Sequence, residues 1–211
     1  MVKHSIRPGI TRLKTPDTPT FAVARRTGLL VPAVQCASPN QDDRPTGTEP
    51  SLVVIHGTSL PPGEYGGPHI QALFTNTLDP SGHPYFREID GLAVSSHLLV
   101  RRDGEVVQFV PFDRRAWHAG ASSFRGRATC NDYSVGIELE GSDDDPYTDR
   151  QYRVLAAVLR ALFVAYPGID VRRIAGHCDV SPGRKTDPGP AFDWLRLYDE
   201  LKVRSGEPGN A

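Results

Sequence analysis

A loop near the carboxyl end of the chain carries an imidazole, an ammonium and a carboxylate: His177, Lys185 and Asp187. Prolines and glycines are expected to keep this stretch out of regular structure. A second imidazole, His56, ends an apolar run far upstream. Catalytic zinc takes three protein ligands and keeps a position open for water, whereas structural zinc is closed by four, usually with sulfur. His56, His177 and Asp187 are therefore predicted to form a catalytic zinc site, although their donor atoms also suit other divalent metals.

Metal-assisted hydrolysis of an amide also needs a group that moves protons and a group that stabilises negative charge. Glu138 lies in a predicted strand beside Ser134 and Gly136, whose small side chains leave room for a ligand. Lys185 lies two residues before Asp187, so in an extended segment both side chains point the same way and the cation is near the metal. Glu138 is the candidate general acid and base, and Lys185 the candidate for stabilising the oxyanion. The alternatives are a solvated strand face for Glu138 and a surface position for Lys185.

Three more side chains are candidates for the surroundings of this site. His97 lies on the polar face of a predicted strand. Its predicted role is that of a hydrogen-bond partner to a metal ligand, of a metal ligand itself, or of a structural hydrogen-bonding group. Trp117 follows a proline break and suits stacking on a sugar ring, or a place in the core. Tyr85 lies in a loop over 79–90 that proline and glycine interrupt.

Hydrophobic periodicity predicts the elements that position these residues. Strands are predicted over 52–56, 94–100, 106–110 and 134–140, with a turn at Asp103-Gly104 between the second and third. Helices are predicted over 68–75, from the capping box at Thr148–Gln151 to Pro167, and over 191–202. This order predicts an α/β fold with a mixed central β-sheet flanked by α-helices. Residues 1–50 are expected to form an irregular N-terminal arm, with an edge strand or surface packing at 28–32, and residues 51–211 the compact zinc amidase domain.

Composition sets the expected compartment and partners. The net charge of -1 gives no bulk attraction to nucleic acid or to anionic membranes. No stretch approaches the roughly 18 apolar residues of a membrane span, and the N-terminus lacks the apolar stretch of a signal peptide. Three scattered cysteines, Cys36, Cys130 and Cys178, argue against a disulfide framework. A cytoplasmic protein is therefore expected, with no nucleic acid or membrane partner.

Five segments occur in the order of a known family: Val54–His56, Ser95–His97, Arg115–Gly120, Cys130–Gly141 and Gly176–Pro190. They resemble the N-acetylmuramoyl-L-alanine amidases of the type 2 amidase family, whose fold is shared by peptidoglycan-recognition proteins. The resemblance implies Zn²⁺ on His56, His177 and Asp187, with Glu138 and Lys185 catalytic. It also implies hydrolysis of the amide between 1,6-anhydro-N-acetylmuramic acid and L-alanine, in small muropeptides recovered during cell-wall recycling.

The resemblance extends to the residues that bind the substrate. The substrate-binding residues that it implies in this sequence are Tyr85, His97, Trp117, Arg127 and Asn131. The loops that carry three of them, Tyr85, Trp117 and Arg127, are expected to form a pocket for one sugar and its peptide. Enteric members have arginines for the peptide stem where this chain has Ala93 and Thr129, and an asparagine at Gly57. Arg125 or Arg127 are the candidates to replace those arginines.

Two other functions are compatible with parts of the sequence. Some peptidoglycan-recognition proteins lack metal ligands and only bind muropeptides, but here the three ligands, Glu138 and Lys185 are all present. A redox role for Cys178 has little support because no C-x-x-C motif occurs, and a small buried side chain is the preferred interpretation. The expected oligomeric state is a monomer.

Overall fold

The computed structural model describes residues 19–203. Its strands are β1 Ala22–Ala24, β2 Leu29–Val31, β3 Val34–Gln35, β4 Gln41–Asp43, β5 Leu52–Thr58, β6 Leu98–Val100, β7 Val106–Gln108, β8 Arg114–Ala116, β9 Ser123–Phe124, β10 Arg127–Ala128, β11 Ser134–Glu140 and β12 Ile174–Gly176. Its helices are α1 His69–Phe74, α2 Pro84–Glu88, α3 Asp149–Ala165, α4 His177–Val180 and α5 Trp194–Val203, with short 3-10 helices η1 Cys130–Asp132 and η2 Val171–Arg173.

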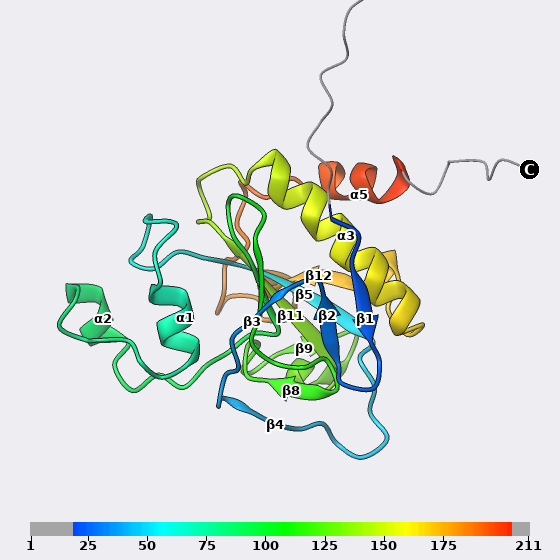
Figure 1. Cartoon of the computed structure of the whole chain (residues 1–211), viewed down its shortest axis with the longest axis horizontal. Coiled ribbons are helices and arrows are strands. Elements are labelled where there is room, and N and C mark those ends of the chain that lie inside the picture. Colours follow the sequence, from blue (N-terminus) through cyan, green and yellow to red (C-terminus); the bar gives the residue numbers. More distant parts are fainter. Residues whose placement is uncertain (1–18, 204–211) are drawn as a thin grey trace, which may run out of the picture.

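Six strands form the central sheet in the order β12-β5-β11-β6-β7-β3. The first four are parallel to their neighbours, β6 and β7 form the predicted antiparallel hairpin, and β3 is parallel to β7. Figure 1 shows α3 (yellow) crossing the sheet with α5 (red) beside it, and α1 and α2 grouped at another side. The predicted mixed sheet with flanking helices is confirmed. No helix in the described part of the chain is long and apolar enough to cross a membrane.

Side chains alternate between the two faces of β5 and β11. Val135, Ile137 and Leu139 pack with α3 in the largest hydrophobic cluster. The helix starts at the predicted capping box, where the Thr148 hydroxyl accepts from the Gln151 amide. The Gln151 side chain also donates to backbone carbonyls at the ends of β6 and β11, which fixes the helix to the sheet. The opposite face of the same strands is therefore left for His56 and Glu138.

The segment before residue 51 is more ordered than the irregular arm predicted for it. Four short strands lie between residues 22 and 43; β3 extends the main sheet, and β4 pairs antiparallel with β8. Phe21 and Leu30 are buried in the main core. Strands of two or three residues are too short to show a periodicity. β1 and β2 pair with each other, whereas the partners of β3 and β4 lie far along the sequence. The part of the predicted arm before residue 19 lies outside the described residues.

Local structure differs from the sequence prediction at three other places. The 79–90 segment contains a helix, α2, whose first turn is capped by the His83 side chain. Only Leu98–Val100 of the strand predicted over 94–100 joins the sheet. His177 begins the short helix α4, so it does not lie in the irregular loop that its neighbouring prolines and glycines suggested.

Candidate metal centre and active site

The three predicted metal ligands meet at the carboxyl ends of parallel strands, where sites in such sheets commonly form. His56 lies near the end of β5, and His177 directly follows β12, the neighbouring strand. His56 Nδ1 lies 2.9 Å from His177 Nδ1 and 3.1 Å from Asp187 Oδ2. His177 Nδ1 lies 3.0 Å from the same Asp187 oxygen. The structure thus brings all three side chains together, with one donor atom from each at a corner of a nearly equilateral triangle.

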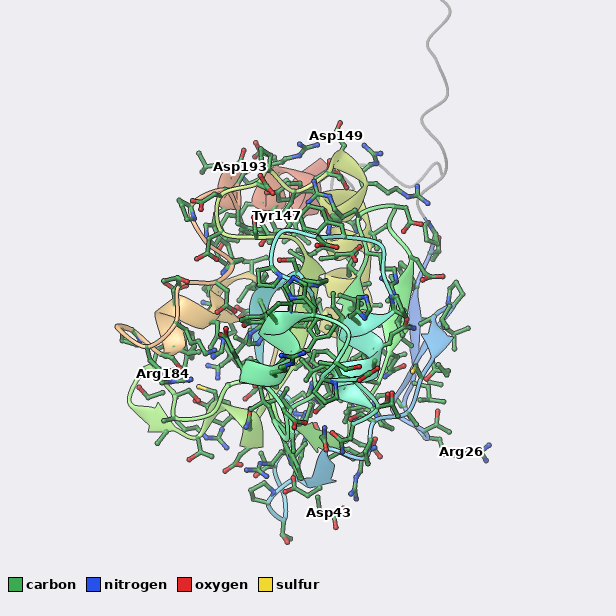
Figure 2. The ribbon with its side chains drawn as sticks, turned by 90° about the vertical axis from the view of Figure 1, so that its left-hand side faces the viewer. Arg26, Asp43, Tyr147, Asp149, Arg184 and Asp193 are labelled. Atoms are coloured by element: carbon green, nitrogen blue, oxygen red, sulfur yellow. The ribbon has the colours of Figure 1, made fainter. Side chains whose placement is uncertain are left out.

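Backbone contacts place Asp187 beside the two imidazoles. The Cys178 amide in α4 donates to the Asp187 carbonyl at 2.9 Å. The next residue is held from the other side, because the Tyr147 hydroxyl donates to the Pro188 carbonyl at 3.0 Å. Tyr147, labelled in Figure 2, also fills the space above Gly57, where a Cβ atom would lie 2.2 Å from its hydroxyl oxygen. Gly57 is therefore matched to Tyr147, and a larger residue there would displace the hydroxyl that supports this loop.

The charges of the triangle suit a metal ion. Burial lowers the pKa of His56 to about 4, although its hydrogen bond with Asp187 opposes the decrease. Burial disfavours the charged form of Asp187, but hydrogen bonds with His177 and His56 outweigh it and hold the carboxyl pKa below its usual range. At neutral pH the site therefore offers a neutral His56 and an anionic Asp187, the protonation states in which these groups bind metals. Donor atoms about 3 Å apart can all lie within about 2.0–2.2 Å of a single ion, so the residues fit zinc.

Glu138 lies beside the triangle on the central strand β11. It is paired in register with His56, and its Oε1 lies 3.9 Å from His56 Nδ1. Its side chain is nearly buried, and burial together with the charge of Asp187 raises its pKa well above the usual range. Glu140, two residues further along the same face, differs because its carboxylate accepts from Arg101, Arg102 and Gly66. Within residues 19–203 the Glu138 carboxylate meets no hydrogen-bond donor, so it is available to a ligand.

A cavity of about 220 Å³ opens over these groups. Its wall includes the three metal-site side chains and Glu138, and also Lys185, Tyr85, Trp117 and His118. Lys185 is exposed, in the segment that connects α4 to Asp187. The structure thus brings both predicted catalytic residues, together with Tyr85 and Trp117, to the predicted metal site.

Three predicted substrate-binding residues do not reach this cavity. The His97 ring is buried; its Nδ1 accepts from the Gly136 amide and its Nε2 faces the Arg114 carbonyl, as expected of a structural hydrogen-bonding group. The Arg127 guanidinium stacks 3.9 Å from the centre of the Tyr133 ring. Asn131, also buried, accepts two backbone hydrogen bonds from His118 and Ala119.

Arg125, the other proposed replacement for the stem-binding arginines, donates to the Arg172 carbonyl. Neither it nor Arg127 lines the cavity. Arg184 lies in the loop after α4, at the left edge of Figure 2, and donates to the Ala121 carbonyl at 3.0 Å. Lys185 is thus the one lysine or arginine among the described residues on the cavity wall.

Two residues at this site had no predicted role. His118 Nδ1 lies 2.9 Å from His56 Nε2, which makes it the neighbour of a metal-site imidazole. Arg44 is buried and donates to the carbonyls of Asp132 and Ser134 at 3.0 and 2.8 Å. Its position in the segment expected to form an irregular arm gave no sign of burial. The signal for His118 was the small size of Ser134 and Gly136, which leaves space that the His118 ring occupies.

Cys178 does not have the properties of a reactive thiol. It lies in α4 and is a free, half-buried cysteine. Burial, with help from the nearby carboxylates of Asp179 and Asp187, raises the pKa of its thiol. A raised pKa disfavours the thiolate that nucleophilic or redox chemistry requires.

Comparison with known proteins identifies relatives of this chain. Residues 46–190 match the family described as N-acetylmuramoyl-L-alanine amidase. The 1,6-anhydro-N-acetylmuramyl-L-alanine amidase AmpD of Escherichia coli (strain K12) is 61% identical over 170 residues, which cover 81% of this chain and 92% of that protein. A crystal structure of an AmpD selenomethionine derivative aligns with a TM-score of 0.81 at 58% identity, covering 83% of this chain and 97% of that one.

A more distant structure shows a relative with its substrate. It is the complex of the N-acetylmuramyl-L-alanine amidase AmiD from E. coli with anhydro-N-acetylmuramic acid-L-Ala-D-gamma-Glu-L-Lys. It aligns with a TM-score of 0.53 at 28% identity, covering 74% of this chain and 60% of that one. With a family match over most of its length and AmpD similar at 61% identity, this chain belongs to the N-acetylmuramoyl-L-alanine amidase family.

Proposed function

We propose that the chain is a zinc-dependent amidase of cytoplasmic cell-wall recycling. Its substrate would be a 1,6-anhydro-N-acetylmuramyl peptide, and the bond cut would be the amide between the lactyl group of the sugar and L-alanine. The main observation in support of this function is the triangle of donor atoms from His56, His177 and Asp187. The Glu138 carboxylate lies beside this triangle on the wall of the same cavity. The names of AmpD and of the AmiD complex support the choice of substrate.

Each proposed step uses a residue on the cavity wall. A zinc ion held by His56 Nδ1, His177 Nδ1 and Asp187 Oδ2 would acidify a water molecule and polarise the amide carbonyl. Glu138 takes a proton from the attacking water as a new C–O bond forms. The same carboxyl group then gives that proton to the amine of L-alanine as the C–N bond breaks. Burial and the charge of Asp187 raise the pKa of Glu138, so its carboxyl group holds the proton taken from water more firmly than a free carboxyl does, until the proton passes to the leaving amine.

Other side chains on the cavity wall can stabilise the charge that develops during the reaction and can bind the substrate. Negative charge develops on the carbonyl oxygen during the attack, and the Lys185 ammonium is the cation on the wall that can stabilise it. Trp117 and Tyr85 offer aromatic surfaces to the sugar. A cavity of about 220 Å³ suits part of one sugar with its peptide better than a long glycan strand. We propose that the catalytic domain is the predicted segment 51–211 and that the protein acts as a monomer.

The first expected result compares substrates. Purified protein should release the peptide from 1,6-anhydro-N-acetylmuramyl tripeptide much faster than from intact peptidoglycan under identical conditions. A chelator should stop the release and added zinc should restore it, and metal analysis should find about one zinc per chain. Binding of the tripeptide without cleavage, with zinc bound, would instead support the muropeptide-binding module. A preference for intact peptidoglycan would contradict the recycling role and leave the metal chemistry in place.

Lys185→Ala is expected to slow hydrolysis by about 10²–10³-fold, the usual cost of losing one group that stabilises an oxyanion. Zinc content should not change, because Lys185 donates no ligand atom to the triangle. Steady-state kinetics and metal analysis on the same preparation check both statements. Lys202→Ala is the matched control, since that lysine is exposed and pairs with Asp199 on α5. A near-normal rate for Lys185→Ala with zinc bound would remove the residue from the mechanism.

A further inference from the structure

His118 contacts a metal-site histidine on the side away from the metal. Its Nδ1 lies 2.9 Å from Nε2 of His56, and its Nε2 lies 3.1 Å from the Ser134 hydroxyl. The two imidazole rings are perpendicular, with centroids 5.1 Å apart. Both nitrogens of His118 therefore have a partner within the protein.

These contacts accommodate the tautomer of His56 that can bind a metal. His56 Nδ1 can bind a metal only when it is unprotonated, so the proton must lie on Nε2. That N–H then donates to His118 Nδ1, and the His118 Nε2–H donates to the Ser134 hydroxyl. In this arrangement each of these hydrogen bonds has a donor and an acceptor while His56 presents a free Nδ1 to Asp187 and His177. Partners of this kind orient metal-binding histidines and fix their tautomer.

The sheet is shaped to receive the His118 ring. A Cβ atom added at Gly136 would lie 2.5 Å from the His118 Cγ and 2.7 Å from its Nδ1. Glycine at this position lets the ring lie against β11, between His97 and His56. The room that Ser134 and Gly136 leave on the strand is thus filled by a side chain of the protein itself.

The backbone of the same loop supports the second imidazole. The Asn131 Oδ1 accepts from the amides of His118 and Ala119, at 3.2 and 2.8 Å. The Ala119 carbonyl in turn lies 3.4 Å from Nε2 of His177. The Arg184 guanidinium lies at the same distance from this nitrogen. When His177 binds a metal through Nδ1, its proton lies on Nε2, and the Ala119 carbonyl is then the acceptor for it. One amide side chain thus anchors the two residues that meet both histidines.

We propose that His118 and Asn131 are positioning residues that hold His56 and His177 with their Nδ1 atoms toward the metal. His118 acts through its hydrogen bond to His56, and Asn131 acts by fixing the loop that carries His118 and the Ala119 carbonyl. The inference rests on the proposed metal site. It explains why His56 and His177 both direct Nδ1 toward the metal site. It also gives Asn131 a role different from the substrate contact predicted for it.

The test measures zinc affinity directly, by titrating metal-free protein against a chromophoric zinc chelator. His118→Phe keeps a ring but removes both hydrogen bonds, and should weaken zinc binding about 10–100-fold, the usual effect of losing such a partner. His118→Asn places its Oδ1 where the Nδ1 was, and should bind zinc nearly as tightly as the wild type. Likewise Asn131→Ala should weaken zinc binding, whereas Asn131→Asp, which keeps the accepting oxygen, should restore most of it.

Thermal melting of the metal-free variants separates positioning from folding. The proposal expects the metal-free melting temperatures of His118→Phe and His118→Asn to be similar while their zinc affinities differ. If the phenylalanine ring does not fit, His118→Leu makes the same comparison with a smaller side chain. The proposal is overturned if a folded His118→Phe or His118→Leu binds zinc as tightly as the wild type, or if His118→Asn loses as much affinity as they do. Failure of the wild type itself to bind zinc would show that the proposed metal site, on which this inference depends, is wrong.

Discussion

Replacing Glu138 by glutamine should slow amide hydrolysis by about 10²–10⁴-fold, the usual contribution of a positioned general acid or base. Glutamine keeps the size of the side chain and removes only the ability to accept and return a proton. Zinc content should remain at the wild-type level, because Glu138 is adjacent to the three donor atoms without being one of them. The measurement is kcat on the anhydro-muramyl tripeptide, with metal analysis of the same sample.

Glu140→Gln is the matched control on the same strand face. Glu140 pairs with Arg101 and accepts two backbone amides, so its replacement should lower the unfolding free energy by about 1–3 kcal/mol. Its rate, measured where the protein is folded, should stay near that of the wild type. A Glu138→Gln enzyme that hydrolyses at the normal rate with zinc bound would show that another group transfers the proton.

Asp187→Ala should abolish activity by removing the metal. Two imidazoles would remain, and loss of one of three ligands should weaken zinc binding by more than the roughly 10–100-fold that loss of an outer hydrogen-bond partner costs. The anionic charge of the site would also disappear. Equilibrium dialysis against buffered zinc, followed by metal analysis, gives the expected loss directly.

Asp193→Ala provides the control for Asp187. Asp193, labelled at the upper left of Figure 2, accepts from the Arg196 amide at the start of α5. Its loss should cost about 1 kcal/mol of stability, as for other helix caps, and leave the bound zinc unchanged. Full zinc content and activity in Asp187→Ala would contradict the proposed ligand set.

The sequence was informative where residue type and strand pattern coincide. β11 has the predicted bounds, and its alternation correctly assigned Glu138 to the face opposite α3. His56 was identifiable because it is a polar residue at the end of an apolar run, where a strand meets a loop. The capping box at Thr148 likewise marked the start of α3, since it depends only on residues three apart.

The remainder depended on contacts between distant segments. β3 and β4 are short and acquire their partners from β7 and β8, so neither could be recognised locally. The role of His118 depends on a glycine in β11 that only the folded sheet places beneath it. Asn131 and Arg127 have side chains suited to substrate binding, and only the folded structure shows that they contact the protein's own backbone and Tyr133.

The order of strands in the sheet has a consequence for synthesis of the protein. β5 is made early but lies between β11 and β12, which come much later in the chain. While the chain is still on the ribosome, this apolar strand lacks both neighbours, and pairing between such distant segments folds slowly. His177 and Asp187 are also among the last residues of the domain to be made. Metal uptake should therefore follow translation, and a nascent chain that ends before β12 should depend on chaperones to shield β5 from aggregation.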